Sequence, residues 1–153
     1  MKTRGEPRDL DHDLEQAIPF LVARAGARMG NAFAKALKPF ELSLTEWRVC
    51  ASLQFAPRQT LSELALHAST DLSALSRIVD RLVLRRLVVR ERCGDDRRAV
   101  RIALSRAGLS LTRRIIPLAR HYESVALSDF SAAEVRTLRH LLSRLYRNAT
   151  SLV

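Results

Sequence analysis

Aromatic residues are scarce in this sequence: five Phe, two Tyr and one Trp make up only 5% of its 153 residues. Proteins that bind RNA or single-stranded DNA usually stack bases on several exposed aromatic rings. Because a hydrophobic core also needs some of these side chains, few rings are left for stacking. If the partner is a nucleic acid, the composition therefore favours duplex DNA.

Cysteines and paired metal ligands are also rare. The chain has two cysteines, Cys50 and Cys93, which are far apart and form no CxxC pair, and its four histidines show no paired ligand spacing. The five glycines form no phosphate-binding loop, and no arrangement of a nucleophile with a base is visible. We therefore expect no metal, no cofactor and no enzymatic activity, with Cys50 as a small buried side chain and Cys93 inert at the surface.

Long hydrophobic runs are absent as well. No apolar segment approaches the ~18 residues that span a bilayer. The first residues lack the apolar core of a signal peptide. We therefore expect a cytoplasmic protein that does not span a membrane.

Positive charge, by contrast, is abundant. The chain has 26 Lys and Arg against 16 Asp and Glu, a formal net charge of +10. Such an excess favours a polyanionic partner, either a nucleic acid or an anionic membrane surface, and charge alone leaves both open. The hydrophobic fraction of 47% is ample for one folded domain.

Most of the chain has the periodicity of helices. Apolar residues recur every three or four positions over 14–37, where Pro19 predicts either a short preceding helix or a kink, and Pro39 predicts the end. Capping boxes at 43–46, 60–63 and 131–134 each predict the start of a helix. A further helix over about 72–86 has Leu75, Ile78, Val79 and Leu82 on one face, and Ser105 can cap another.

One segment instead has the strand period. Residues 88–92 and 99–104 alternate between β-branched and charged side chains around a polar turn at 93–98, which predicts a hairpin. The expected fold is mainly α, a winged helix-turn-helix with a two-stranded β-hairpin wing.

The short helix over 61–68 and the helix over 72–86 are joined by very few residues. This is the helix-turn-helix layout, in which the second helix enters the major groove. Small side chains near its start allow close approach to bases, and Arg77 can reach a phosphate or guanine. The expected DNA contacts on this helix are Ser73, Ala74, Ser76, Arg77 and Arg81.

Arginines also cluster around the expected wing. Arg97 and Arg98 at its tip suit a narrow minor groove, and Asp96 can orient the Arg98 guanidinium through a bidentate pair. For Arg90, Arg92, Arg97 and Arg101, general attraction to DNA and a defined contact remain equally good interpretations.

The sequence resembles the MarR-type regulators in three segments: DLSALSRIVDRL at 71–82, DRRA at 96–99 and LSRAG at 104–108. The last two resemble that family's wing signature, and the order of elements agrees from about residue 11 to 150. The resemblance implies one domain over 1–153, with dimerisation helices at 11–40 and 105–150 and a DNA-binding lobe at 43–104. It also implies a homodimer on a pseudo-palindromic operator, with Arg98 in the minor groove and a ligand or oxidant that lowers DNA affinity.

The sequence departs from that family after the recognition helix, where the family usually has a glycine and this chain has Arg85-Arg86-Leu87. A left-handed residue other than glycine is costly at a helix end. We therefore expect this helix to end in a different turn.

The first helix carries small side chains at Ala23, Ala27, Gly30 and Ala34. They indicate either close helix packing or one wall of a cavity. In the second interpretation, Arg24, Arg28 and Trp47 bind an aromatic acid or an aromatic acyl-CoA.

These features together predict a sequence-specific transcriptional regulator of duplex DNA, a repressor released by an anionic aromatic ligand. The alternative is a non-specific nucleoid-associated or RNA-binding protein. A peripheral membrane protein would need a basic helix with bulky apolar residues on its opposite face. The arginines here lie mainly on the expected DNA face, so we expect no membrane partner.

Overall fold

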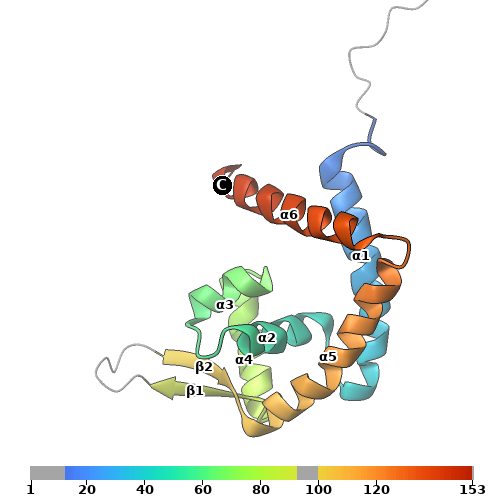
Figure 1. The fold of residues 1–153 in the computed structure, drawn as a ribbon. Helices are drawn as coiled ribbons and strands as arrows, with labels where there is room; N and C mark the ends of the chain where they lie inside the picture. The colour runs from blue at the N-terminus through green and yellow to red at the C-terminus, as the bar shows by residue number, and fades with distance from the viewer. Residues whose placement is uncertain (1–12, 93–99, 153) are drawn as a thin grey trace, which may run out of the picture.

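The computed structural model describes residues 13–92 and 100–152. It is mainly helical with one two-stranded sheet, so the predicted fold class is confirmed (Figure 1). A small lobe contains the short helices and the sheet, and two long helices, α1 and α5, rise from it. The elements are α1 (Ile18–Leu37), the 3-10 helix η1 (Lys38–Phe40), α2 (Leu44–Phe55), α3 (Leu61–Ala68), α4 (Leu72–Leu84), β1 (Val88–Arg92), β2 (Val100–Leu104), α5 (Arg106–Ala126), α6 (Ala132–Ala149) and the 3-10 helix η2 (Thr150–Leu152).

The start of α1 differs from both possibilities expected at Pro19. Residues 14–16 form a turn, and Pro19 lies in the first turn of α1. A proline is tolerated there because the first N–H groups of a helix need no helical partner. Pro19 therefore marks the beginning of the helix, and Pro39 follows its end as predicted.

The side chains predicted to cap helices do so. Ser43, Thr60 and Ser131 each accept a hydrogen bond from the backbone N–H three residues later, and the Glu at that position accepts one in return. Ser105 caps α5 through the N–H of Gly108, 3.0 Å away. Each cap stabilises its helix by roughly 1 kcal/mol, which explains why the sequence located these starts correctly.

The core fills the lobe and the lower ends of α1 and α5. The apolar face predicted for α4 is buried along its whole length. A buried side chain of this kind contributes roughly 1.5–3 kcal/mol, and the largest ones are fully enclosed: Leu37, Leu53, Leu64, Leu75, Leu82, Ile102 and Ile115.

The sheet is the predicted antiparallel hairpin, with Val88 opposite Leu104 and Arg92 opposite Val100. The beginning of α5 packs directly on its base. A Cβ atom at Gly108 would lie 1.9 Å from the carbonyl oxygen of Leu87, so only glycine fits this approach. The glycine of the LSRAG segment therefore has a packing role.

The end of α4 corrects the expectation of a different turn. The N–H of Arg86 donates to the carbonyl of Val83, and the N–H of Leu87 donates to that of Leu82. This is the Schellman pattern usually completed by glycine, and here Arg86 adopts the left-handed conformation with φ 57°. The two hydrogen bonds and the burial of Leu87 outweigh the strain at Arg86.

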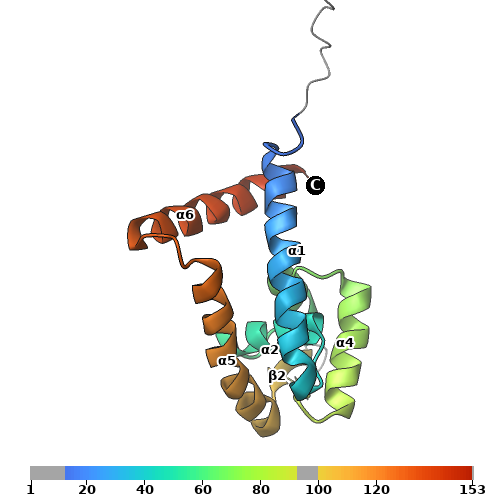
Figure 2. The same cartoon turned by 90° about the vertical axis from the view of Figure 1, so that its right-hand side faces the viewer.

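The last helix, α6, extends away from the lobe (Figures 1 and 2). Within the part of the chain that the structure describes, none of its residues is buried. Its apolar residues Leu141, Leu142, Leu145 and Tyr146 are 40–60% exposed. A helix with such a face usually packs against a partner.

Candidate nucleic-acid interface and ligand pocket

The turn between α3 and α4 sets the direction of α4. Ser69 is left-handed with φ 50°, and the side chain of Asp71 accepts a hydrogen bond of 2.9 Å from the N–H of Ala74. These features end α3 and start α4 within three residues, which is the predicted helix-turn-helix.

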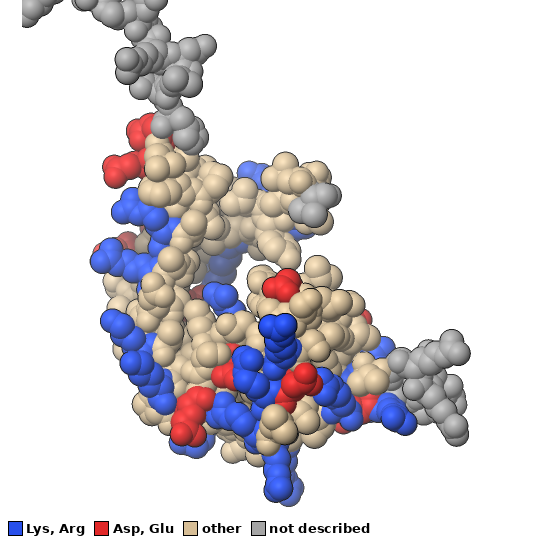
Figure 3. Space-filling model, turned by 180° about the vertical axis from the view of Figure 1, so that it is seen from behind, with Lys and Arg blue, Asp and Glu red and all other residues tan. Residues whose placement is uncertain are grey.

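The residues expected to contact DNA share the outer face of α4. Ser73, Arg77 and Arg81 are exposed, whereas Ala74 and Ser76 are half-buried. Their apolar neighbours on the opposite face lie in the core. Seen from behind, the lower lobe, where α4 lies, carries many Lys and Arg side chains interspersed with acidic ones (Figure 3).

One of these arginines is held by a buried acid. Nε of Arg81 lies 3.4 Å from Oε1 of Glu46, whose side chain is only 10% exposed. Burial by itself raises the pKa of Glu46, but hydrogen bonds from Ser43 and the attraction of Arg81 outweigh it and hold this pKa below its usual range. Glu46 is therefore an anion at neutral pH, and it restrains Arg81 from α2.

Two arginines of the wing strands are also paired within the protein. Nη2 of Arg90 lies 2.6 Å from Oδ1 of Asp80 on α4. Arg101 donates to the carbonyl of Arg58 at 2.9 Å and lies 3.6 Å from Glu63. For these two side chains, positioning of the wing explains the contacts better than general attraction to DNA.

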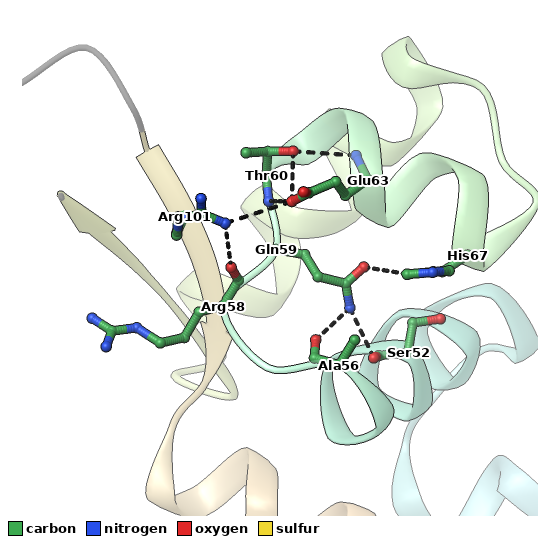
Figure 4. A network of polar contacts seen from close by, with 8 residues as sticks. All are labelled: Ser52, Ala56, Arg58, Gln59, Thr60, Glu63, His67 and Arg101. Carbon is green, nitrogen blue, oxygen red and sulfur yellow. Dashed lines mark hydrogen bonds and ion pairs between the residues drawn. The ribbon is translucent and has the colours of Figure 1, made fainter. Parts of the chain in front are cut away.

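Gln59 connects β2 to the helix-turn-helix (Figure 4). It is buried, and its backbone exchanges hydrogen bonds with Ile102. Its side-chain nitrogen donates to the carbonyls of Ser52 and Ala56, and its oxygen faces Nδ1 of His67. Sequence reasoning missed this residue, because nothing in the local pattern distinguishes Gln59 from an ordinary loop residue.

The tip of the wing lies outside the described residues. The predictions for Cys93, Asp96, Arg97 and Arg98 concern this segment and stay predictions. Arg92, the last described residue before it, is exposed.

A pocket of about 690 Å³ lies between the middle of α1, the beginning of α2 and the last turns of α5. Its walls are largely apolar, and the ring of Phe33 contacts those of Trp47 and Tyr122 edge to face at centroid distances of 5.8 and 5.4 Å. The residues that line it are Ala25, Gly26, Arg28, Met29, Gly30, Ala32, Phe33, Leu44, Trp47, Arg48, Ala119, Tyr122, Glu123, Val125 and Ala126.

The residues predicted to bind a ligand are therefore only partly brought together. Arg28 and Trp47 line the pocket, whereas Arg24 lies over the ring of Phe20, with its guanidinium carbon 5.3 Å from the ring centroid. Of the predicted small-residue stripe, only Gly30 lines the pocket. The other small residues that line the pocket are Ala25, Gly26 and Ala32, because α1 turns a neighbouring face toward it.

Two charged residues at this pocket were missed from the sequence. Arg48 adds a second cation beside Arg28. Glu123 lines the pocket and lies 2.9 Å from Arg139 of α6, so its charge is already compensated. The pocket thus offers two arginines and one acid that is already paired.

Cys50 is buried, as predicted. Burial and the negative charge of Glu46 raise the pKa of its thiol to about 12. Among the described residues, no cluster of three or more potential ligands could hold a metal ion. No helix in the described ranges has the length and hydrophobicity needed to cross a membrane.

Comparison with known proteins identifies the family. The model of the MarR family matches residues 40–99. The HTH-type transcriptional repressor IacR of Pseudomonas putida is 25% identical over 143 residues, which cover 93% of this chain and 86% of IacR.

Two solved structures have the same fold. A probable transcriptional regulator from Pseudomonas aeruginosa is 30% identical, with a TM-score of 0.75 over 86% of this chain and 98% of its own. BpsR of Bordetella bronchiseptica is 21% identical, with a TM-score of 0.75 over 84% of this chain and 98% of its own. Its structure concerns the regulation of DNA binding by 6-hydroxynicotinic acid. The sequence match, the winged helix-turn-helix and these relatives agree: the chain belongs to the MarR family of transcriptional regulators.

Proposed function

We propose that this protein is a repressor that binds a pseudo-palindromic operator as a homodimer and releases it when an anionic aromatic compound enters the pocket between α1, α2 and α5. The observation that carries this proposal is the position of the pocket. Its lining comes from the long helices α1 and α5 and from Leu44, Trp47 and Arg48 of α2, which belongs to the DNA-binding lobe, so a ligand there contacts both parts.

The dimer is supported by the apolar faces of α1 and α6. Ile18, Leu21 and Val22 on α1 are 42–56% exposed, and the apolar residues of α6 are exposed to a similar degree. Burial against a second copy would remove this surface from water, at ~25 cal/mol per Å². Sedimentation at micromolar concentration should give the mass of a dimer. A monomer would contradict the proposal.

In the proposed complex the outer face of α4 lies in the major groove. Arg77 and the small residues Ser73 and Ala74 read the bases, and Arg81 contacts a phosphate. Arg98 enters the minor groove, as the family resemblance implies, and Asp96 orients it, with Arg97 as a further DNA contact at the tip of the wing. Each wing and recognition helix engages one half-site.

Binding to the operator and to random duplex DNA separates these roles. Arg77→Ala should weaken operator binding by roughly 1–3 kcal/mol per lost base contact, with a smaller effect on random duplex. Arg98→Ala should lose most affinity on operators with A/T-rich flanks. Arg120→Ala, which removes the same charge from the exposed surface of α5, is the control. If Arg77→Ala and Arg98→Ala lose the same affinity on operator and on random duplex, the protein binds DNA without sequence specificity.

The ligand is proposed from the chemistry of the pocket. Arg28 can hold a carboxylate in a bidentate pair, with Arg48 as a second cation. The rings of Trp47, Phe33 and Tyr122 form an apolar wall for a flat molecule. The names of two relatives agree with this proposal, since IacR is a repressor and DNA binding by BpsR is regulated by 6-hydroxynicotinic acid, an aromatic acid.

Release requires that the ligand bind the DNA-free form better than the DNA-bound form. Aromatic acids and their thioesters should be titrated against the protein–operator complex. Arg28→Ala and Trp47→Ala should raise the ligand concentration that releases half of the DNA. Arg24→Ala is the matched control, because Arg24 lies on the same helix over Phe20 and outside the pocket. If no compound releases DNA, the pocket has another role.

A further inference from the structure

We propose that Arg85 and Glu46 determine which half-site spacing the dimer accepts, because they fasten the C-terminal end of α4 to the corner between α1 and α2. This inference rests on the proposed function, since it concerns a dimer bound to two half-sites. Neither residue needs to touch a base. They act as positioning residues for the recognition helix.

The fastening consists of three contacts between residues that lie 35 to 44 positions apart in the sequence. Nη1 of Arg85 donates to the carbonyl oxygen of Glu41 at 2.7 Å and lies 3.9 Å from Oε2 of Glu46. Nε of Arg81, one turn earlier in α4, lies 3.4 Å from Oε1 of the same carboxylate. One buried acid thus holds two arginines on the last turns of the recognition helix.

The acceptor for Arg85 lies at the end of the arm that α1 and η1 form. Glu41 directly follows η1, and η1 continues from the last residue of α1, Leu37, which is fully buried. Glu41 is left-handed with φ 54°, a conformation that costs free energy for a residue other than glycine. The hydrogen bond from Arg85 therefore joins α4 to a residue that the folded structure holds in a costly backbone conformation.

The carboxylate at the centre of the fastening is buried, whereas its two arginines are partly exposed. The Glu46 side chain is 10% exposed and that of Arg85 33%. Salt screens partly buried charges less than exposed ones, and a buried acid without its partners is strongly disfavoured. Glu46 also closes the capping box of α2 with Ser43, so its own position is fixed by the helix start.

The consequence for DNA recognition is geometric. Two half-sites of such a dimer lie about one helical turn apart, or a multiple of it. One extra base pair between them shifts the second half-site by about 3.4 Å and rotates it by roughly 35°. A recognition helix fixed to the arm cannot follow this change, whereas a loosely held one can. The fastening should therefore appear as discrimination between spacings.

The test uses the full-length protein and synthetic duplexes that carry its footprinted operator, unaltered or with one base pair inserted or removed at the centre. The measured quantity is the ratio of the dissociation constants on altered and unaltered duplexes. Arg85→Met and Glu46→Gln should each reduce this ratio by about threefold or more, the size expected when contacting residues are uncoupled. Together they should reduce it little further.

The choice of Glu46→Gln and two control variants keep the test specific. Glu46→Gln retains an oxygen for the capping box, so α2 still begins at the same residue. Arg86→Met removes the same charge from the next, exposed position and should leave the ratio unchanged. Arg85→Lys, which keeps the charge and a donor for Glu41, should restore part of the discrimination. Thermal unfolding of each variant shows that it is folded.

Two results would contradict the inference, and the experiment distinguishes them. If the parent protein prefers the operator and discriminates between spacings, but Arg85→Met and Glu46→Gln keep the parental ratio, the fastening does not set spacing and this inference is wrong. If the parent binds operator and random duplex equally, the proposed function is wrong, and the inference falls with it.

Discussion

Arg90 on the first wing strand is held by Asp80 on the recognition helix, with Nη2 and Oδ1 2.6 Å apart. Both side chains are about half exposed, so the pair itself adds little stability, of the order of 0–1 kcal/mol. Its effect is to orient the wing and to occupy an arginine that would otherwise be available to phosphates.

Asp80→Asn should therefore release Arg90 toward the DNA. The variant should bind random duplex more tightly, and its salt dependence should steepen by about 0.9 for a new phosphate contact. In the parent protein, Arg90→Ala should change the slope of the salt dependence little. In the Asp80→Asn background, Arg90→Ala should return the slope to the parental value. Titrations at several salt concentrations measure the slopes. An unchanged slope in Asp80→Asn would show that Arg90 never reaches a phosphate.

Gly108→Ala should destabilise the protein by about 2 kcal/mol or more, in the range of overpacked cores. The added methyl group would meet the carbonyl oxygen of Leu87 at 1.9 Å, and backbone atoms cannot swing aside as a side chain can. Gly26→Ala is the control, because nothing lies within 4 Å of the added Cβ and alanine favours a helix interior. Urea unfolding of both variants measures the difference. Equal stabilities would mean that the contact relaxes at no cost.

Arg86→Gly should stabilise the folded protein by roughly 1 kcal/mol, because it relieves the left-handed strain at φ 57°. Part of this gain is offset by the greater freedom of glycine in the unfolded chain. Arg92→Gly is a useful comparison, because Arg92 is also an exposed arginine but lies in a strand, where glycine is unfavourable. Chemical denaturation would show a higher midpoint only for Arg86→Gly. A lower midpoint there would contradict the assigned strain.

Cys50 should resist alkylation in the folded protein. Burial raises the pKa of its thiol to about 12, and the reactive form is the thiolate. In a Cys93→Ser background at pH 8.5, labelling by iodoacetamide should be slow and should become fast in denaturant. Rapid labelling without denaturant would show that the helix around Cys50 opens readily.

The same pKa shift has a defined effect on stability. The pKa of Cys50 in the folded protein lies above its value in the unfolded chain, about 8.5. The contribution of the protonated thiol to the free energy of unfolding is therefore complete below that pH. Between that pH and pH 12, this contribution falls by up to about 1.4 kcal/mol per pH unit. Cys50→Ala should flatten this part of the curve of unfolding free energy against pH. If the unfolding free energy of Cys50→Ala falls as steeply at alkaline pH as that of the parent, other groups cause the pH dependence.

The sequence alone determined where α2, α3, α5 and α6 begin and which class of protein the elements form. Caps at Ser43, Thr60, Ser105 and Ser131 act within three residues, and the apolar face of α4 follows from its period, so neighbours in sequence decide both. The wing hairpin was predicted for the same reason, because β-branched and charged residues alternate along its strands.

Contacts between residues far apart in sequence were decided only by the tertiary structure. The pairs of Glu46 with Arg81 and of Arg90 with Asp80, the burial of Gln59, and the face that α1 turns toward the pocket all depend on how the helices pack. The Schellman turn at Arg86 was mispredicted because local strain argued against it, while the burial of Leu87 and two backbone hydrogen bonds favoured it. Periodicity identifies which face of a helix is apolar, but which partner that face meets is set by the free energy of packing the whole chain.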